Sequence, residues 1–221
     1  MGLSNVTRMI VGPIETNCFF LENKESHEVA IIDPGESGEE IYGRIKRQGM
    51  HLTAVLLTHG HFDHITGIAA LLSAAAQDGK ADVPVYAAET EERLLKDVSL
   101  NGSDGMGRGG VTAKADRLLK DGEVFSLAGF SIRCIHTPGH TEGSCCYYVE
   151  SEGLLFSGDT LFEGSVGRTD FPTGSMRVLL SSIKGKLFKL PDETRVLTGH
   201  GGDTTIGDEK RYNPFLSGDA I

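Results

Sequence analysis

The stretch LLTHGHFDHITG, residues 56–67, places three histidines and one aspartate within six positions, directly after an apolar run. His59 and His61 are two residues apart, so in extended backbone their side chains point the same way and can bind one metal ion. Asp63 and His64 stand where a helical pattern begins, so their side chains point elsewhere, toward a second ion. The stretch therefore predicts a metal site where a strand meets a helix.

Metal sites need several nitrogen or oxygen ligands, and three further candidates follow along the chain. They are His140 in HTPGHTEG, Asp159 in LLFSGDTLF and His200 in VLTGHGG. Each follows a glycine where an apolar run stops, and open α/β folds build their sites at such strand ends. Any one of them alone is more often a surface, cap or turn residue. Together, five histidines and two aspartates are about what two metal ions need once a carboxylate and a water bridge them.

The other three histidines lack this setting and are interpreted as structural: His27, His51 and His136.

The periodicity of apolar residues predicts strands and amphipathic helices in two loosely similar halves. Strands are expected at residues 6–12, 17–22, 28–35, 53–59, 83–88, 144–150, 153–159 and 194–201, and a hairpin over 122–139 turns near Ala128–Gly129. Helices are expected at 37–49, 65–76, 89–97 and 175–191, the last capped by Ser175. Both halves run from strands through a helix to a strand that ends at a histidine, which indicates two similar units packed together.

The segment NGSDGMGRGGVTAK, residues 101–114, interrupts this pattern. Gly105, Gly107 and Gly110 satisfy G-x-G-x-x-G, but dinucleotide binding needs a strand before that motif and a helix after it. Here a helix precedes the motif and no helical pattern follows. We therefore expect a mobile loop that can serve as a lid.

The composition predicts one soluble globular domain with a sizeable core, because the chain has 221 residues, 39% of them hydrophobic and 24% charged. Its net charge of -10 disfavours nucleic acid as a partner. We find neither a signal-peptide pattern nor an apolar run of membrane-spanning length. The four cysteines form no C-x-x-C pair, which favours reduced, buried thiols in a cytoplasmic protein.

The motifs as a set resemble those of a known family. THGHFDH, residues 58–64, looks like the T-H-x-H-x-D-H signature of the metallo-β-lactamase superfamily. TPGHTEGS (137–144), FSGDTLF (156–162) and TGHGGDTT (198–205) are similar to its later ligand motifs in the same order, and DPG at 33–35 also fits. The resemblance covers almost the whole chain. It implies a four-layer αββα sandwich of two pseudo-equivalent halves, in a single domain over residues 1–221.

The resemblance also implies the ligand sets of a binuclear site, with His59, His61 and His140 on the first metal, Asp63, His64 and His200 on the second, and Asp159 bridging. The implied ions are two divalent metals, zinc first and iron or manganese as alternatives.

Within the superfamily, the segments 164–175 (GSVGRTDFPTGS) and 204–215 (TTIGDEKRYNPF) look most like the short, single-domain bacterial branch of the glyoxalase II group. That group hydrolyses S-acylglutathione thioesters. True β-lactamases of this fold usually have Cys where Asp159 stands, so we exclude them. The implied reaction is attack of a metal-bridged hydroxide on the thioester carbonyl, with Asp63 orienting the hydroxide and taking its proton.

The chain departs from glyoxalase II at the positions that bind glutathione. Arg168 stands for a Lys, Asp170 falls where a Tyr is expected, and Gly202 replaces a further Tyr. About twenty residues follow His200, so we expect no C-terminal helical substrate domain. Arg168 is the predicted substrate contact, and a structural ion pair with Asp170 is the alternative.

Two other functions stay open. An iron-dependent persulfide dioxygenase of the same fold shares the motifs, and a non-catalytic metal-binding scaffold is the non-enzymatic alternative. The expected partner is a small-molecule thioester, with neither nucleic acid nor membrane, and the sequence leaves the oligomeric state open.

Overall fold

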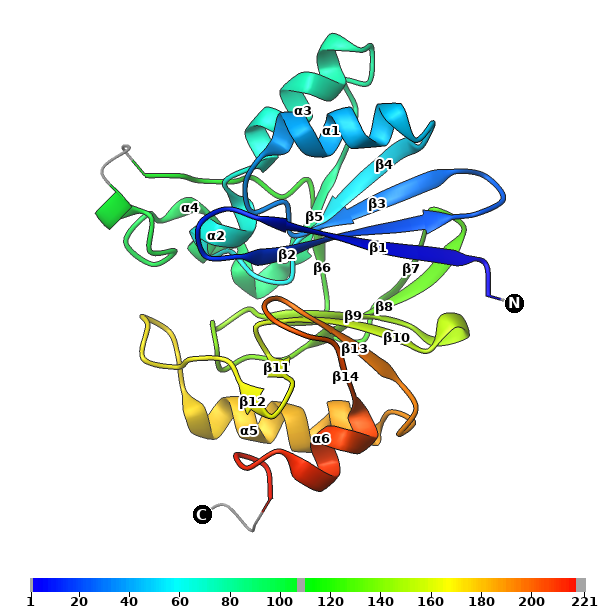
Figure 1. The fold of residues 1–221 in the computed structure, drawn as a ribbon. Coiled ribbons are helices and arrows are strands. Elements are labelled where there is room, and N and C mark those ends of the chain that lie inside the picture. Colours follow the sequence, from blue (N-terminus) through cyan, green and yellow to red (C-terminus); the bar gives the residue numbers. More distant parts are fainter. Residues whose placement is uncertain (1, 107–109, 218–221) are drawn as a thin grey trace.

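The computed structural model describes residues 2–106 and 110–217. Two six-stranded sheets face each other, and helices cover the outer side of each (Figure 1). The first sheet has the order β1 (Ser4–Val11), β2 (Thr16–Asn23), β3 (Glu28–Ile32), β4 (His51–Leu56), β5 (Val85–Ala88), β6 (Arg117–Leu119). The second has the order β14 (Thr204–Thr205), β13 (Arg195–Thr198), β10 (Leu154–Gly158), β9 (Cys145–Val149), β8 (Phe130–His136), β7 (Val124–Leu127). The expected αββα sandwich is confirmed.

The helices lie outside the sheets or beside the predicted site. They are α1 (Gly38–Arg47), α2 (Phe62–Ile65), α3 (Ile68–Gln77), α4 (Glu92–Lys96), α5 (Met176–Gly185) and α6 (Ile206–Tyr212). A small hairpin of β11 (Leu161–Phe162) and β12 (Ser165–Val166) stands apart from both sheets. Among the residues that the structure describes, no helix combines the length and the apolar character needed to cross a bilayer.

The two sheets are built alike, as the sequence predicts. Strands β1 to β3 pair antiparallel, and β3 to β6 pair parallel. In the second sheet β7 to β10 pair antiparallel and β10 pairs parallel with β13. Parallel strands end at one edge of a sheet, so the loops after β4, β10 and β13 can meet there.

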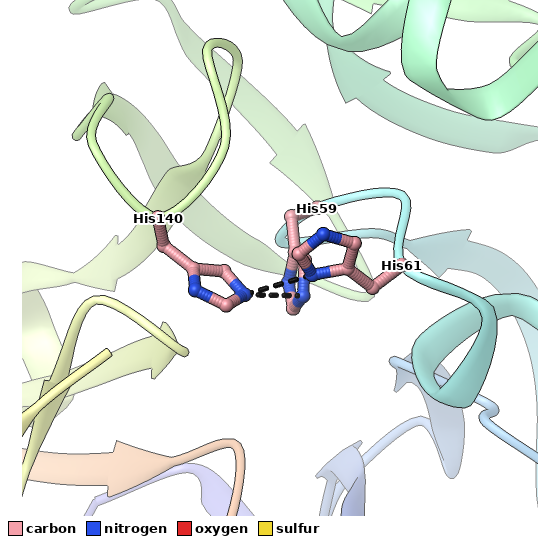
Figure 2. Close-up of side chains that lie close together, drawn as sticks. All are labelled: His59, His61 and His140. Atoms are coloured by element: carbon pink, nitrogen blue, oxygen red, sulfur yellow. Dashed lines mark hydrogen bonds between the residues drawn. The ribbon is translucent and has the colours of Figure 1, made fainter. Parts of the chain in front are cut away.

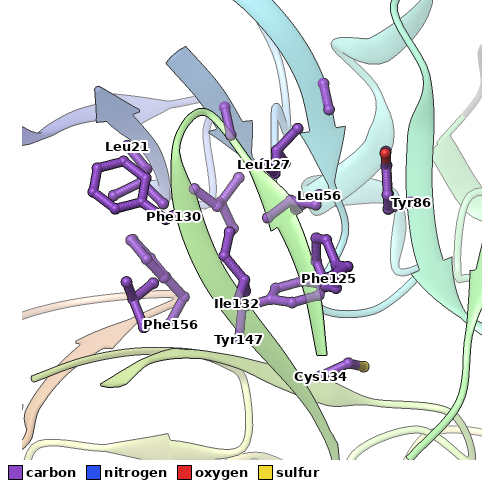
Figure 3. Close-up of a cluster of buried hydrophobic side chains, with 14 of the residues drawn as sticks. Leu21, Leu56, Tyr86, Phe125, Leu127, Phe130, Ile132, Cys134, Tyr147 and Phe156 are labelled. Carbon is purple, nitrogen blue, oxygen red and sulfur yellow. The ribbon is translucent and has the colours of Figure 1, made fainter. Parts of the chain in front are cut away.

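The central core lies between the sheets (Figure 3). The run NCFFLE reads as continuously apolar because β2 is buried on both faces. Phe19 and Leu21 point to the central core, and Cys18 and Phe20 point to the outer core beneath α1 and α3. A separate core under α5 contains Leu179 and Ile183.

Several predicted elements are confirmed and several differ in their bounds. The Ser175 side chain caps α5 by accepting from the Val178 N–H, and the turn at Ala128–Gly129 has positive φ at both residues. The helix expected over 65–76 is two helices, α2 and α3, because Gly67 packs against the Pro34 carbonyl and its N–H donates to that oxygen. The helix expected over 175–191 ends at Gly185, and a 3₁₀ turn follows at Leu187–Lys189.

The segment 101–114 contains a 3₁₀ turn at Asp104–Met106 and neither strand nor α-helix in its described part. Residues 107–109, which include Gly107 of the G-x-G-x-x-G match, lie outside the described residues. The lid therefore stays a prediction.

Candidate metal centre

The structure brings all the sequence-predicted ligands into one cluster at the edge where the two sheets meet. The loop after β4 and helix α2 supply four of them, and the loops after β8, β10 and β13 supply one each. They are His59, His61, Asp63, His64, His140, Asp159 and His200.

Three histidines form a first group (Figure 2). Nε2 of His140 lies 2.8 Å from Nδ1 of His61 and 3.2 Å from Nε2 of His59. The Nδ1 of His140 lies 2.7 Å from the Arg168 carbonyl oxygen, which can only accept. The proton of the neutral ring therefore sits on Nδ1, and the Nε2 lone pair faces the other two rings, as in a ligating imidazole.

Asp63, His64 and His200 form a second group. Oδ2 of Asp63 lies 3.3 Å from Nε2 of His200 and 3.5 Å from Nε2 of His64. The far nitrogen of His200 contacts the Ile14 carbonyl oxygen at 3.2 Å, which again directs the Nε2 lone pair into the cluster.

Asp159 lies between the two groups. Its Oδ2 is 3.6 Å from Nε2 of His140 and 3.6 Å from Nε2 of His200, and its Oδ1 is 3.4 Å from Nε2 of His64. One carboxylate therefore reaches both groups, which is the placement that a bridging ligand needs.

The charges of the two groups differ. Burial and the neighbouring imidazoles hold the pKa of His59 well below its usual value and lower that of His61 to about 3, so both rings are neutral at pH 7. Burial also acts to lower the pKa of His64, but Asp63, Asp159 and Asp33 outweigh it and raise that pKa well above its usual value. Three carboxylates around one ring make this end of the cluster a place for positive charge.

The residues present fit two divalent cations. Nε2 of His64 and Oδ1 of Asp159 are buried and lack a hydrogen-bond partner among the described residues. Buried polar atoms without partners are costly, and a cation would satisfy both. Three nitrogens in one group, and two nitrogens with one oxygen in the other, form a donor set that suits zinc, iron or manganese.

Two supporting residues were assigned no role from the sequence. Asp33 accepts from the N–H and the hydroxyl of Thr58, at 2.8 and 2.6 Å, and its Oδ2 lies 3.0 Å from Nδ1 of His64. The Thr16 hydroxyl donates to Oδ2 of Asp63 at 3.1 Å. The only signal for Asp33 was its place at a strand end in DPG, and Thr16 gave none.

The glycines before the later ligands have steric reasons. Gly139 has φ +136, and a Cβ there would overlap the backbone of Leu179. A Cβ on Gly199 would overlap Oδ1 of Asp159. Glycine therefore precedes His140 and His200 because the loops pass so close to other parts of the site.

The histidines interpreted as structural lie outside the cluster. His136 is buried, with Nε2 3.1 Å from the Leu119 carbonyl oxygen. His27 contacts Glu22 at 2.9 Å, and His51 is exposed on β4.

A cavity of about 410 Å³ opens onto the cluster. Its walls are largely apolar, with Ile14, Phe62, Phe162, Val166 and Phe171 among the lining residues. Such a shape suits a small organic molecule whose reactive group faces the polar cluster.

Arg168 also lines this cavity, with an exposed side chain. Its guanidinium binds Asp170 through two contacts of 3.0 and 2.9 Å and lies 4.4 Å from the centre of the Phe171 ring. The alternative of a pair with Asp170 is thus realised. A surface pair of this kind is weak, so it leaves Arg168 able to turn toward a ligand.

The C-terminal helix supports the opposite wall of the cavity. Glu209 of α6 is buried and accepts from the Gly164 N–H, the Thr204 hydroxyl and the Asn213 amide. The Asn213 amide also donates to the carbonyl oxygen of Ser165. These contacts fix the β11–β12 hairpin, which contributes Phe162, Ser165 and Val166 to the cavity.

Residues 11–200 match a family model described as the metallo-beta-lactamase superfamily. The chain is 46% identical over 214 residues to a protein of Bacillus subtilis named probable metallo-hydrolase YqgX, covering 96% of this chain and 97% of that protein. It is 36% identical over 215 residues to hydroxyacylglutathione hydrolase GloC of Haemophilus influenzae, covering 96% and 98%.

Solved structures agree with this relationship. The crystal structure of BLEG-1 B3 metallo-beta-lactamase is 42% identical with a TM-score of 0.88, covering 97% of this chain and all of the other. The crystal structure of TTHA1623 in a di-iron-bound form is 36% identical with a TM-score of 0.81, covering 95% and all of the other. The exclusion of β-lactamases from the sequence therefore does not stand, because a protein with that title shares the whole fold.

Proposed function

The chain belongs to the metallo-beta-lactamase superfamily, and from that premise we propose that it is a metal-dependent hydrolase of thioesters of the S-acylglutathione type. The observation that carries the proposal is the convergence of five imidazoles and two carboxylates on the floor of an apolar cavity. The similarity to a hydroxyacylglutathione hydrolase supports the choice of thioester.

The proposed ligands are those named from the sequence: His59, His61 and His140 for one ion, Asp63, His64 and His200 for the other, and Asp159 between them. Bound there, two divalent ions would supply a hydroxide at neutral pH and stabilise negative charge on the carbonyl oxygen. Zinc is our first choice, and the di-iron form of a relative supports iron as an equal candidate.

The chain's own residues would do the remaining work. Asp63 carries a carboxylate whose pKa is held low by His64 and His200 against the effect of burial, and it accepts the proton of the attacking water. A C–O bond forms at the carbonyl carbon and the C–S bond breaks. The sulfur leaves as a thiolate, which needs no dedicated acid because thiols have a pKa of about 8.5. The proton held by Asp63 then passes to it.

Arg168 is our proposed substrate contact. Its guanidinium stands at the cavity and can exchange Asp170 for a carboxylate of the substrate. Phe62, Phe162 and Phe171 would then enclose the apolar part of the molecule.

A β-lactam is the second candidate substrate. The similarity to a protein titled B3 metallo-beta-lactamase favours it. The same donors would serve, but an amide nitrogen is a poorer leaving group than a thiolate and gains more from protonation.

The test combines metal analysis with a substrate panel. The purified protein is analysed for zinc, iron and manganese, then assayed with S-lactoylglutathione, the matching oxygen ester, a β-lactam, and glutathione persulfide under an oxygen electrode. We expect two metals per chain and turnover fastest on the thioester. One iron per chain with oxygen uptake on persulfide would replace the proposal with the dioxygenase, and turnover only on the β-lactam would replace it with the second candidate. Metal binding without turnover of any substrate would leave a scaffold.

A further inference from the structure

Glu91 is a buried carboxylate outside the proposed ligand set. It ends a 3₁₀ turn, Glu89–Glu91, just before α4, and is 1% exposed although its neighbour Glu89 is on the surface. Burying a carboxylate is costly unless several donors surround it. Its surroundings therefore indicate what it does.

The donors come from two loops in opposite halves of the molecule. Oε1 of Glu91 accepts from the Gly60 N–H at 2.7 Å, and Oε1 and Oε2 accept from the Thr141 hydroxyl at 2.9 and 3.0 Å. The Gly143 N–H is a further donor. Every acceptor position that these donors need is supplied by one side chain.

These donors lie next to the first group of histidines. Gly60 separates His59 from His61, and Thr141 follows His140 directly. The chain from residue 59 to residue 61 belongs to the half with the first sheet, and His140 belongs to the half with the second. Glu91 thus connects the two loops whose spacing fixes the distances between the three ring nitrogens.

We propose that Glu91 is a positioning residue for the first metal position, and that it sets the affinity of that position by holding the His59–His61 loop against the His140 loop. This inference rests on the ligand assignment of the proposed function. The described structure gives Glu91 no hydrogen bond to Asp63, His64 or His200, so the second position is independent of it.

The experiment separates the two positions by removing one ligand of each. His200→Ala leaves the first position complete, and His140→Ala leaves the second with its own three ligands. Each protein, with and without Glu91→Gln, is stripped of metal and titrated with Co²⁺, which is followed by its visible absorption. The amide of Gln is the same size, but its NH₂ faces a backbone or hydroxyl donor, so one loop loses its acceptor.

We expect Glu91→Gln to weaken Co²⁺ binding about 10- to 100-fold in the His200→Ala background. In the His140→Ala background we expect no more than about a twofold change, because partners of ligands act on their own ion. Glu89→Gln removes a charge two residues away on the surface and is the matched control, expected to change neither. Thr141→Val removes one donor only and is expected to weaken the first position to a smaller degree, so it tests the same point if Glu91→Gln does not fold.

Equal losses at both positions, or no loss at the first, would overturn the positioning role while leaving the proposed function intact. A parent chain that binds no Co²⁺ would overturn the ligand assignment and the positioning role together.

Discussion

Asp63 has two proposed roles, as a ligand and as the proton acceptor, and substitution can separate them. Asp63→Asn keeps an oxygen donor but removes the negative charge that takes the proton. We expect kcat on the thioester to fall by about 100-fold or more, with at least one metal ion per chain retained. Steady-state kinetics with metal analysis of the same preparation checks this. Unchanged turnover in the Asn variant would contradict the proposed mechanism.

Arg168 offers a test of substrate binding that leaves the chemistry alone. In Arg168→Met the apolar stem stays over Phe171 but the charge is lost. We expect KM for S-lactoylglutathione to rise about five- to tenfold with kcat unchanged, because the contact is equally present in ground and transition states. Asp170→Asn releases the guanidinium and should lower KM. If both variants keep the parent KM, Arg168 is only a surface residue.

Glu91 predicts a pH dependence of stability. Burial raises the pKa of this carboxyl to about 7 from 4.5, although hydrogen bonds from Gly60, Thr141 and Gly143 act to lower it. Between pH 4.5 and 7 the folded state keeps a proton that the unfolded state has lost, so the stabilisation is present below pH 4.5 and is lost as pH rises to 7.

Glu91→Gln lacks this titration. The free energy of unfolding of the parent minus that of the variant should fall by about 3 kcal/mol between pH 4.5 and pH 8. Urea denaturation of both metal-free proteins measures it, and a difference that stays constant with pH would count against the raised pKa.

At the level of residues, sequence reasoning located the cluster and missed part of its support. His140, Asp159 and His200 were found because uncommon residue types follow glycine at strand ends. Glu91 gave no such signal, since the chain has 31 acidic residues and its partners lie 31 and 50 positions away. Only the folded chain brings those donors to it.

Among the elements, long periodic segments were predicted better than short ones. Strand β6 has three residues and β14 two, too few to show alternation, and the sequence indicated neither. Helix α6 was also missed, because its seven residues mix charges with few apolar positions. Its role is tertiary, in holding the β11–β12 hairpin through Glu209.

Glu209 gives a prediction for that helix. Glu209→Ala would leave the buried donors of Gly164, Thr204 and Asn213 without an acceptor. We expect the free energy of unfolding to fall by about 2–3 kcal/mol. We also expect KM to rise while metal content is unchanged, because the cavity wall loosens but the ligands do not. Denaturant titration and kinetics report the two effects separately, and an unaltered KM would show that the hairpin does not depend on α6.

Across the whole molecule, the four-layer arrangement followed from the sequence because both halves repeat the same order of elements. The contacts between the halves did not. Asn17, for example, joins them by donating its N–H to the Gly199 carbonyl at 2.7 Å and its side-chain amide to the Thr198 carbonyl at 2.9 Å. Such pairings depend on how the sheets are placed, which no local pattern encodes.

Each proposed metal position takes ligands from both halves, so metal removal should weaken the entire fold. We expect a chelator to lower the melting temperature by about 10 °C in one cooperative transition, and added Zn²⁺ to restore it. Scanning calorimetry measures the shift. His140→Ala, which lacks one ligand, is the control and should shift less; equal melting with and without chelator would mean that no ion binds.

The first sheet ends at Leu119 and the second begins at Val124, so the chain completes one before it starts the other. During synthesis the first half leaves the ribosome with an uncovered inner face that includes Phe19, Leu21 and Leu56. It holds four of the seven proposed ligands, all in residues 56–67, and two at most for either ion. The nascent half is therefore adhesive and poor at capturing metal. Maturation must run in a fixed order, with translation of the second half first, closure of the sheets next and metal loading last.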